Sequence, residues 1–436
     1  MDPVKVGVLG LGTVGGGTVN VLRRNMGEIA RRAGREISVV KASARDLSVE
    51  RICRTTDIEL FADPFEIVND SSIEIVVESI GGESIAKELV LQAISNGKHV
   101  VTANKALIAL HGNEVFSLAQ EMGVMVAFEA AVAGGIPIIK VLREGLSGNR
   151  VEWLAGIING TGNFILTEMR DKSRDFADVL AEAQALGYAE ADPTFDVEGI
   201  DAAHKLTILA SIGFGIPLQF EKAYTEGIGQ ITRADVAYAE QLGYRIKHLG
   251  IARKNRKGIE LRVHPCLIPE RRLLANVDGV MNAVVVKGDA VGPTLYYGAG
   301  AGAEPTASAV VADLVDVVRT LTSDPENRVP HLAFQADSLS DTLIVDIEEI
   351  KTPYYIRLNA EDRPGVLADV TGILARHNIS IEAVIQKEPL DGESQIPVIM
   401  LTYGILEKEM NAAISEIVVL ETVKGPITRI RVETLD

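Results

Sequence analysis

Runs of consecutive apolar residues alternate with amphipathic stretches over residues 1–137. The runs are typical of strands buried on both faces. They lie at Val4–Leu9, Ile37–Ser43, Ile73–Gly82, within KHVVTANKAL, and at Val124–Phe128. The stretch after the first run and the stretch Ile85–Asn96 have helical spacing instead. Alternating strands and helices of this kind predict an open, mostly parallel sheet of the Rossmann type.

The pattern changes from residue 138 onward. Strands such as WLAGIING and LRVHPCLI alternate with helices, and Gly199–Ile212 has helical spacing. The helix ASAVVADLVDVVRTL is interpreted as the chain returning to cover the first domain. After a connector, a strand at Tyr354–Leu358, a helix that Pro364 begins, the strands VIQKE and IPVIMLTY, and a helix at Met410–Leu420 predict a small βαββαβ module.

The predicted fold is therefore α/β, with four parts along the chain. These are a Rossmann-type dinucleotide-binding domain (1–137 plus 302–321), an α+β substrate domain (138–301), a linker (322–352) and the βαββαβ module (353–436).

Composition excludes several classes of protein. The chain has 436 residues, 47% of them apolar, and a formal net charge of −17, which argues against nucleic-acid binding. Cys53 and Cys266 match no disulfide or metal framework. No apolar run approaches the roughly 18–20 residues of a membrane-spanning helix. We expect a soluble, cytoplasmic protein.

A Gly-x-Gly-x-x-Gly motif lies between the first strand and the first helix. Gly10 permits the tight turn, Gly12 lets the backbone approach a pyrophosphate, and Gly15 lets the helix pack on the strand. Thr13 and Val14 open the helix, whose N-terminus would face the phosphates. The motif predicts a dinucleotide coenzyme.

The second strand ends at Ala44-Arg45-Asp46, where the ribose specificity of such a coenzyme is set. An acid favours the ribose hydroxyls of NAD, whereas an arginine favours the 2′-phosphate of NADP. We favour NADP through Arg45, with NAD left open.

Two further positions follow strands of the predicted sheet. Lys105 lies just past the strand in KHVVTANKAL, at the edge where ligands bind, although a surface cation would also fit. Glu129, with the carbonyls of Val132, Gly134 and Ile136, could hold a hard cation or simply cap a turn.

An acidic stretch, GYAEADPTFDVEGIDAAHK, runs from Gly187 to Lys205. Helical spacing places Asp201 and Lys205 one turn apart, which is a solvated salt bridge in the plainest interpretation. An apolar run, LTILASIGFGI, follows the lysine and predicts that its stem is buried. Convergent carboxylates beside it suit a cationic amino-acid substrate.

Over its whole length the chain resembles homoserine dehydrogenase. The resemblance rests, in order, on GLGTVG, TANKAL, EAAVAGGIPI, INGTGNFILTEM, LGYAEADPTFDVEGIDAAHKLTILA and GAGAGAEPTASAVV. The DRPGVLA turn in the C-terminal module resembles an ACT domain, a regulatory fold that binds amino acids. Because no kinase domain precedes the nucleotide fold, the chain is similar to the monofunctional form.

The resemblance implies NAD(P)-dependent interconversion of L-homoserine and L-aspartate 4-semialdehyde, a step toward threonine, isoleucine and methionine. It also implies roles for individual residues: Lys205 as acid/base, Lys105 beside nicotinamide and substrate, Glu190, Asp201 and nearby Asp196 for the substrate ammonium, Gly187 and Gly302 for the coenzyme, and Glu129, Val132, Gly134 and Ile136 for sodium. Gly162 departs from the family, which mostly has threonine there.

The chemistry agrees with these roles. Hydride leaves the alcohol carbon only as the hydroxyl proton departs, so a base must lie within hydrogen-bond reach. A free lysine is a poor base at neutral pH, and burial with a second cation such as Lys105 would improve it. A direct pair with Asp201 would oppose this, so Asp201 is assigned chiefly to the substrate ammonium.

Two alternatives remain open from the sequence. One is another amino-acid or semialdehyde dehydrogenase, such as an aspartate-type oxidoreductase. The other is a silent amino-acid sensor in which the ACT module is the function. For that module we expect feedback by L-threonine near Gly365 and Asn378 at a module–module interface, in a homodimer or homotetramer in which the 138–301 domain dimerises.

Overall fold

The computed structural model describes residues 2–325, 328–386 and 395–436. The chain forms two compact units, each built from three segments. The first unit contains residues 1–154, 201–223 and 281–342, and the second contains residues 155–200, 224–280 and 343–436. These two units do not coincide with the four predicted parts of the chain. The four-part division therefore stays a prediction.

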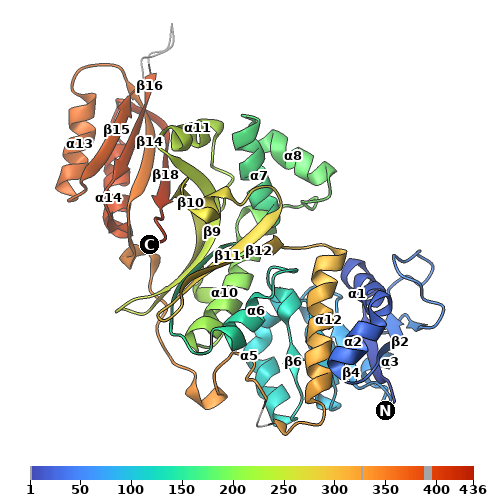
Figure 1. The fold of residues 1–436 in the computed structure, drawn as a ribbon. Helices are drawn as coiled ribbons and strands as arrows, with labels where there is room; N and C mark the ends of the chain where they lie inside the picture. Colours follow the sequence, from blue (N-terminus) through green and yellow to red (C-terminus); the bar gives the residue numbers. More distant parts are fainter. Residues whose placement is uncertain (1, 326–327, 387–394) are drawn as a thin grey trace. The chain divides into compact units, whose positions relative to one another are not determined.

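The first unit contains a six-stranded sheet with the order β3-β2-β1-β4-β5-β6, and every pairing in it is parallel (Figure 1). Its strands are β1 (Val4–Leu9), β2 (Ile37–Ser43), β3 (Glu59–Phe61), β4 (Ile75–Glu78), β5 (His99–Thr102) and β6 (Val126–Ala127). An antiparallel pair, β11 (Met281–Gly288) and β12 (Gly292–Ala299), belongs to the same unit.

Helices of the first unit are α1 (Thr13–Arg24), α2 (Met26–Ala33), α3 (Phe65–Val68), α4 (Ser84–Ser95), α5 (Lys105–Glu121), α6 (Ile138–Lys140), α10 (Ile200–Phe214, apart from its first residue) and α12 (Ala303–Thr320). The helices between consecutive strands make the right-handed crossovers that parallel strands require. The predicted Rossmann-type fold is therefore confirmed.

The predicted strands differ from the observed ones mainly at their ends. Strands β1 and β2 have the predicted bounds. The predicted strand Ile73–Gly82 is shorter, since β4 ends at Glu78. Gly81 and Gly82, both at a φ of 75°, turn the chain away from the sheet there.

Helix α12 brings a distant segment back onto the nucleotide sheet, as the sequence predicted. A Cβ on Gly17 of α1 would lie 2.5 Å from the carbonyl oxygen of Ala303, so the two helices approach closely. Arg24 and Glu304 form an ion pair of 2.7 Å between them. Figure 1 shows the two helices side by side. Apolar side chains of α12 join the core of β1 and β4.

The second unit is organised on long antiparallel strands. Its strands are β8 (Tyr224–Thr225), β9 (Tyr244–Lys254), β10 (Ile259–Pro269), β13 (Lys351–Thr352), β14 (Tyr354–Glu361), β15 (Ile381–Gln386), β16 (Gln395–Thr402), β17 (Ile405–Leu406) and β18 (Val423–Val432), while β7 (Val151–Ile157) crosses the boundary. Its helices are α7 (Gly160–Asp171), α8 (Phe176–Ala185), α9 (Thr194–Val197), α11 (Arg233–Gln241), α13 (Val366–Arg376) and α14 (Glu407–Ile417). The order β9-β10-β18-β14-β16-β15 makes one continuous sheet.

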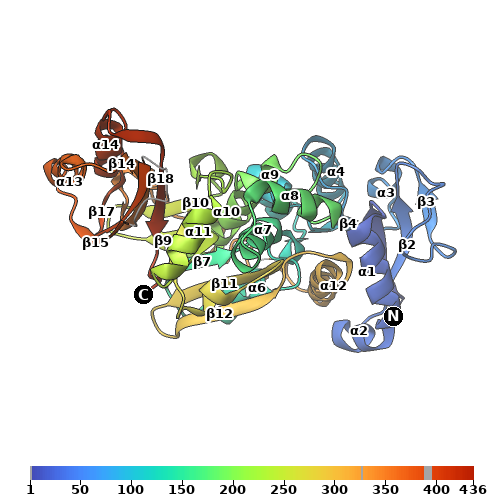
Figure 2. The ribbon, with the colours of Figure 1, turned by 90° about the horizontal axis from the view of Figure 1, so that it is seen from above.

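The C-terminal module has the predicted βαββαβ order, in which β14, α13, β15, β16, α14 and β18 follow one another. Alternation along β14 sends Tyr354 and Ile356 toward α13 and α14, and Tyr355 toward a core shared with α7 and α11. Figure 2 shows both module helices on one face of this sheet. The last two residues of the predicted strand VIQKE lie outside the described residues.

The start of α13 differs from the prediction. Pro364 lies before the helix rather than in it, because Gly365 at a φ of 99° is the N-cap and Val366 is the first helical residue. An L-residue with a Cβ would be strained at that φ, so the turn needs glycine there.

Candidate active site and coenzyme-binding residues

The three glycines of the first turn differ in what surrounds them. Gly10 has a φ of 93°, which makes the tight turn. A Cβ on Gly15 would lie 2.0 Å from the carbonyl oxygen of Gly10, so only glycine lets the helix pack there. A Cβ on Gly12 would meet nothing within 4 Å, which leaves room above the backbone for a phosphate. No side chain caps α1 at Gly12, and Thr13 and Val14 are its first residues.

Arg45 and Asp46 follow β2 at the same edge of the sheet, and both are exposed. The Asp46 carboxylate is occupied locally, because it accepts hydrogen bonds from the backbone N–H (2.8 Å) and the hydroxyl (2.6 Å) of Ser48. These bonds lower the pKa of Asp46. Asp46 therefore holds its own turn through one carboxylate oxygen, Oδ1, and both side chains are exposed at this edge.

A buried carboxylate that the sequence analysis missed organises the neighbouring loops. Glu78, the last residue of β4, is 0% exposed. One oxygen accepts from the backbone N–H groups of Ile80 (2.9 Å) and Gly81 (3.0 Å), and the other accepts from the Thr102 hydroxyl (2.6 Å). Burial raises the pKa of Glu78, and its donors oppose that rise. Glu78 thus ties the loop after β4 to the end of β5.

Asn104 continues this network into α5. Its amide nitrogen donates to the carbonyl of Gly82 (2.7 Å), its amide oxygen caps α5 by accepting from the backbone N–H of Leu107 (3.0 Å), and its backbone N–H donates to Thr102 (3.0 Å). The first residue of that helix is Lys105. The three hydrogen bonds of Asn104 therefore fix the backbone immediately before Lys105.

Lys105 and Lys205 meet at one carboxylate. The Asp201 oxygens lie 3.1 Å from the Lys105 Nζ and 2.7 Å from the Lys205 Nζ. The side chains are 36% exposed for Lys105, 12% for Lys205 and 6% for Asp201, so this is not the solvated surface pair of the plainest interpretation. Asp201 is paired directly with both lysines, which is the arrangement expected to oppose proton release from Lys205.

His204, next to Lys205 on α10, was not predicted as a site residue. Its ring packs 4.2 Å from the ring of Phe220, centroid to centroid. Burial lowers the pKa of His204 to about 4; Asp201 opposes this, and the two lysines add to it. The imidazole is therefore neutral near pH 7 and adds no positive charge beside the lysines.

Glu129 is buried and receives two hydrogen bonds from the start of α6. The backbone N–H groups of Ile139 (2.9 Å) and Lys140 (2.8 Å) donate to its two oxygens. Its own backbone N–H donates to Asp313 (2.7 Å). Burial and the nearby Asp313 raise the pKa of Glu129 to about 7, while the backbone donors and Lys140 oppose this.

The predicted carbonyl ligands lie in the turn that follows Glu129. Val132 precedes Ala133 and Gly134, which have φ values of 55° and 41° and turn the backbone sharply. Ile136 closes the turn, because its N–H donates to the Ala133 carbonyl (2.9 Å). A buried acid with a raised pKa, beside a turn of this kind, fits a hard cation, which would stabilise the ionised carboxylate.

The remaining predicted substrate residues belong to the second unit. Asp196, on α9, is half-buried and accepts a hydrogen bond of 2.7 Å from the Asn159 amide. Asn159 also caps α7, since its oxygen accepts from the backbone N–H of Gly162 (2.7 Å). Glu190 is exposed, and Gly187 ends α8 at a φ of 75°. The contact between Asn159 and Asp196 has no sequence signal.

Gly162 lies beside a buried histidine, His248. A Cβ at Gly162 would lie 3.7 Å from the His248 Nδ1, which is buried without a hydrogen-bond partner among the described residues. The His248 Nε2 is 3.0 Å from the Glu226 carbonyl oxygen. Burial lowers the pKa of His248 to about 4.

In the C-terminal module, Gly365 and Asn378 lie at opposite ends of α13. The helix has 11 residues, which corresponds to about 16 Å. One small ligand within a single module could not contact both residues. Two modules side by side would be needed to bring them together, as the predicted module–module interface requires.

Gly302 lies in the first unit, as the Gly10–Gly15 turn does. It is the N-cap of α12 at a φ of 123°, immediately before the Ala303 that contacts α1. Cys53 and Cys266 are both buried and unpaired by any disulfide. Across the described ranges, neither a helix able to span a membrane nor a cluster of three His, Cys, Asp or Glu side chains was found.

A doubly wound parallel sheet, its glycine turn open to a phosphate and a lysine at the carboxyl edge of that sheet define an NAD(P)-dependent oxidoreductase. Comparisons with known proteins sharpen this class. Family models described as "Homoserine dehydrogenase, NAD binding domain", "Homoserine dehydrogenase" and "ACT domain" match residues 10–129, 137–315 and 354–409. The chain belongs to the homoserine dehydrogenase family.

Relatives match along the whole chain. Homoserine dehydrogenase of Pseudomonas aeruginosa is 66% identical over 436 residues, and the match covers 100% of both chains. The crystal structure of a homoserine dehydrogenase from Thiobacillus denitrificans has a TM-score of 0.95 at 67% identity and covers 100% of this chain and 99% of its own. A hyperthermophilic archaeal homoserine dehydrogenase in complex with NADPH has a TM-score of 0.63 at 28% identity and covers 74% and 99%.

Proposed function

We propose that Lys205 is the acid/base residue of a homoserine dehydrogenase and that Lys105 assists it. The observation that carries the proposal is the shared Asp201 carboxylate, which holds both ammonium groups within 3.1 Å of its oxygens. A proton-transfer residue must be fixed within hydrogen-bond reach of the substrate oxygen, and a buried ion pair on a helix provides that fixation.

When bound, the nicotinamide coenzyme supplies or accepts the hydride. In the oxidation of L-homoserine, Lys205 must first release a proton to solvent, and its neutral amine then receives the hydroxyl proton as the C–H bond breaks. In the reverse reaction, Lys205 returns a proton to the carbonyl oxygen of L-aspartate 4-semialdehyde. Lys105 places a second positive charge near that oxygen, where negative charge develops.

The substrate ammonium is assigned to Glu190, Asp196 and Asp201. Asp196 supports this assignment best, because Asn159 holds one carboxylate oxygen at 2.7 Å and thereby orients the other. Three carboxylates along one short stretch suit the amino group that homoserine and aspartate semialdehyde share. The oxidation of L-homoserine in preference to L-aspartate would distinguish this reaction from an aspartate-type oxidoreductase.

The coenzyme is assigned as NADP, bound by Gly10, Gly12, Thr13, Val14, Gly15 and Arg45 together with Lys105, Gly187 and Gly302. The exposed Arg45 at the end of β2 supports the phosphate-bearing coenzyme, while Asp46 is occupied by its own turn. An arginine recognises phosphate through two parallel N–H donors.

A sodium ion is assigned to Glu129 and the carbonyls of Val132, Gly134 and Ile136. The raised pKa of Glu129 supports a cation there, since a neighbouring positive charge lowers the cost of ionising a buried acid. Thermal unfolding in sodium chloride should occur at a higher temperature than in N-methylglucamine chloride, and Glu129→Gln should remove the difference. Equal unfolding temperatures in the two salts would contradict the site.

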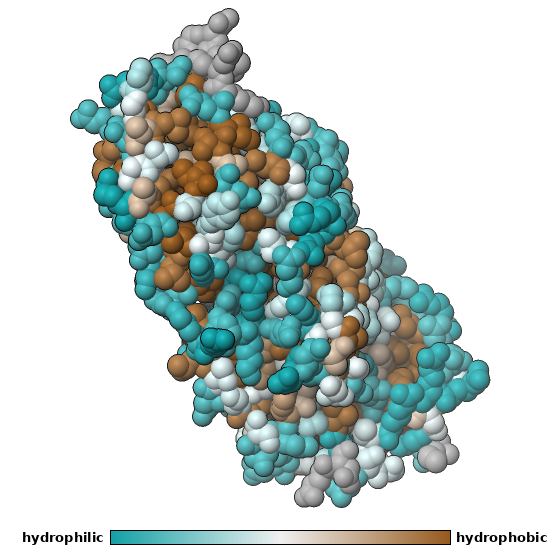
Figure 3. Space-filling model, turned by 60° about the vertical axis from the view of Figure 1, so that its left-hand side comes forward, coloured by the Kyte–Doolittle hydropathy of each residue, from teal (hydrophilic) through white to brown (hydrophobic). Residues whose placement is uncertain are grey.

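Regulation is assigned to the ACT module, with L-threonine bound near Gly365 and Asn378 between two modules. Support comes from the module's position in the chain and from exposed apolar side chains that a second copy would cover. These are Val384, Tyr403, Val418 and Val419. Figure 3 shows apolar surface gathered on this part of one face. A homodimer or homotetramer in the cytoplasm, active in threonine, methionine and isoleucine biosynthesis, completes the proposal.

The test is coenzyme-linked turnover of L-homoserine, L-aspartate 4-semialdehyde and L-aspartate, with NADP(H) and NAD(H), in the presence and absence of L-threonine. Activity confined to the homoserine–semialdehyde pair, faster with NADP(H) and inhibited by threonine, is expected. Absence of turnover with either coenzyme would overturn the catalytic assignment, and insensitivity to millimolar threonine would overturn the regulatory one.

A further inference from the structure

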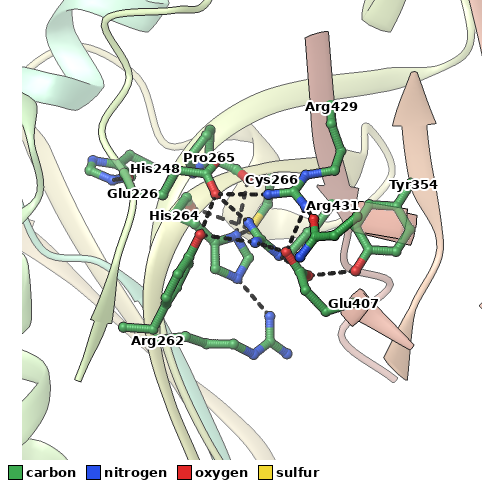
Figure 4. Close-up of polar contacts among 12 residues, drawn as sticks. Glu226, His248, Arg262, His264, Pro265, Cys266, Tyr354, Glu407, Arg429 and Arg431 are labelled. Carbon is green, nitrogen blue, oxygen red and sulfur yellow. Dashed lines mark hydrogen bonds and ion pairs between the residues drawn. The ribbon is translucent and has the colours of Figure 1, made fainter. Parts of the chain in front are cut away.

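A fully buried arginine of the C-terminal module faces two carboxylates. Arg431, on β18, is 0% exposed. Its Nε donates to Glu407 (2.9 Å), its Nη1 to Glu226 (2.8 Å) and its Nη2 to the Tyr224 hydroxyl (3.1 Å). Glu407 is the first residue of α14 and also accepts from the Tyr354 hydroxyl (2.5 Å). Figure 4 shows the side chains of Arg431, Glu407 and Tyr354 from the module converging with that of Glu226.

Glu226 is the partner that does not belong to the module. It follows β8, and its backbone N–H donates to the Val263 carbonyl on β10 (2.8 Å). A second arginine of β18, Arg429, lies 3.7 Å from the same carboxylate and 2.8 Å from that of Glu407. Because removing one partner leaves a buried charge uncompensated, Arg431 holds the Glu226 side chain firmly in place.

The segment after Glu226 is seated on α9. A Cβ on Gly227 would lie 2.6 Å from a carboxylate oxygen of Glu198 and 2.8 Å from the Val197 carbonyl oxygen. The backbone N–H of Ile228 donates to that same carbonyl (3.0 Å). The His248 ring, 3.0 Å from the Glu226 carbonyl, would lie 3.0 Å from a Cβ placed on Gly199. Residues 226–228 therefore contact both the end of α9 and, through His248, the turn after it.

We infer that Glu226 is a positioning residue through which Arg431 of the ACT module fixes α9, and with it the substrate-binding carboxylate of Asp196. This inference rests on the proposed role of Asp196 and deepens it. Two contacts lead from the module to α9, the helix that carries Asp196: the ion pair of Arg431 with Glu226 at 2.8 Å, and the hydrogen bond from the Ile228 N–H to the Val197 carbonyl at 3.0 Å. A displacement of β18 or α14 would thus change substrate affinity without any module residue touching substrate.

A second buried arginine supplies a matched control. Arg262, on β10, is 0% exposed and donates to Glu260 (2.9 Å) and Glu433 (2.6 Å), so it too is held between two carboxylates. The described contacts of Glu260 are with Arg262 and Asn255 rather than with α9. Removal of Glu226 or Glu260 removes one anion from a buried arginine, but only Glu226 is connected to the substrate acid.

The experiment compares Glu226→Ala, Glu260→Ala and Asp196→Asn with the full-length parent. Steady-state kinetics with L-homoserine and NADP⁺ is combined with thermal unfolding and with NADPH binding measured by fluorescence. We expect E226A to raise the KM for homoserine about tenfold, equivalent to about 1.4 kcal/mol, with a smaller change in kcat and unchanged NADPH affinity. E260A should lower the unfolding temperature similarly and leave KM unchanged.

An unchanged KM in folded E226A, or an equal rise in E260A, would overturn the inference. If E226A does not fold, Gly227→Ala takes its place, because its new Cβ would displace Glu198 and α9 directly; a normal KM there would be equally decisive. If the parent protein does not oxidise homoserine at all, the proposed function itself is overturned. Normal KM in D196N would overturn the role of Asp196 and, with it, this inference.

Discussion

The two units each contain a cluster of charges, and the clusters are composed in opposite ways. In the first unit, one carboxylate, Asp201, is shared by two ammonium groups. In the second, Arg431 and Arg429 face two carboxylates, Glu407 and Glu226. The lysine cluster reaches solvent through Lys105, at 36% exposure, whereas Arg431 is fully buried.

The difference separates a cluster suited to chemistry from one suited to architecture. Two cations around one anion favour the arrival of further negative charge, which develops on the substrate oxygen during hydride transfer. Two cations matched with two anions have no such preference, and their multiple hydrogen bonds fix the strands that carry them. Partial exposure of Lys105 leaves the first cluster open to a ligand, and the burial of Arg431 and Glu407 keeps water from weakening their ion pair.

The largest effect is expected at the lysine cluster. Lys205→Ala should lower kcat for homoserine oxidation by roughly 10²–10⁴-fold, since the proton acceptor is removed. NADPH affinity should change little, because Lys205 is assigned to the substrate oxygen. Stopped-flow or steady-state turnover, with fluorescence titration of NADPH, measures both quantities. Near-normal turnover in this variant would remove Lys205 from the acid/base role.

The arginine cluster should respond in stability. Arg431→Met leaves Glu407 and Glu226 without a central cation and should lower the free energy of unfolding by about 3–5 kcal/mol. Lys105→Met, the matched change at a partly exposed lysine, should cost about 1 kcal/mol or less while lowering activity. Urea unfolding followed by circular dichroism compares the two. A larger stability loss for Lys105→Met would reverse our comparison of the two clusters.

Both units should lose stability in acid, for the same reason. Burial lowers the pKa of His204 in the first unit and of His248 in the second to about 4, from an ordinary value of 6.5. Between these values the unfolded chain binds protons that the folded chain does not. The free energy of unfolding should therefore fall as pH falls from about 6.5 to 4, by about 1.4 kcal/mol per pH unit for each such histidine.

Unfolding measured at several pH values, with His248→Asn compared with the parent, checks this slope. The variant should show a shallower acid decline, since one of the contributing groups is absent. An identical slope in parent and variant would mean that His248 takes up its proton equally in the folded and unfolded states.

The smallest effect is expected at the coenzyme. Arg45→Ala should weaken NADPH binding about tenfold and leave NADH binding nearly unchanged, since the ribose phosphate loses its charged partner. Fluorescence titration with both coenzymes measures the ratio. Equal losses of affinity for NADPH and NADH would show that Arg45 does not recognise the 2′-phosphate.

Much of the first unit could be predicted because its signals are local. Runs rich in apolar residues marked β1 and β2 to the residue, and helical spacing alone placed Asp201 beside Lys205. The Gly10–Gly15 motif needed only six residues of sequence, and the observed backbone explains each glycine separately.

Contacts between distant residues could not be predicted in this way. Arg431 and Glu226 are 205 residues apart, and nothing in the pattern around either one indicates the other. Glu78 resembles any acid at the end of a strand until its three donors are seen. The division of the chain into two units likewise depends on contacts between segments that are far apart in the sequence.

The close approach of α12 to α1 has a consequence for synthesis of the protein on the ribosome. Glu304 is synthesised 280 residues after Arg24, so α12 can pack against α1 only after that length of chain has been made. At typical elongation rates this takes roughly a quarter of a minute to one minute. During that time the small-residue face of α1, which α12 later covers, is open to water and to chaperones. The strands of the first sheet are thus translated early, whereas the helix that covers them, α12, is translated late.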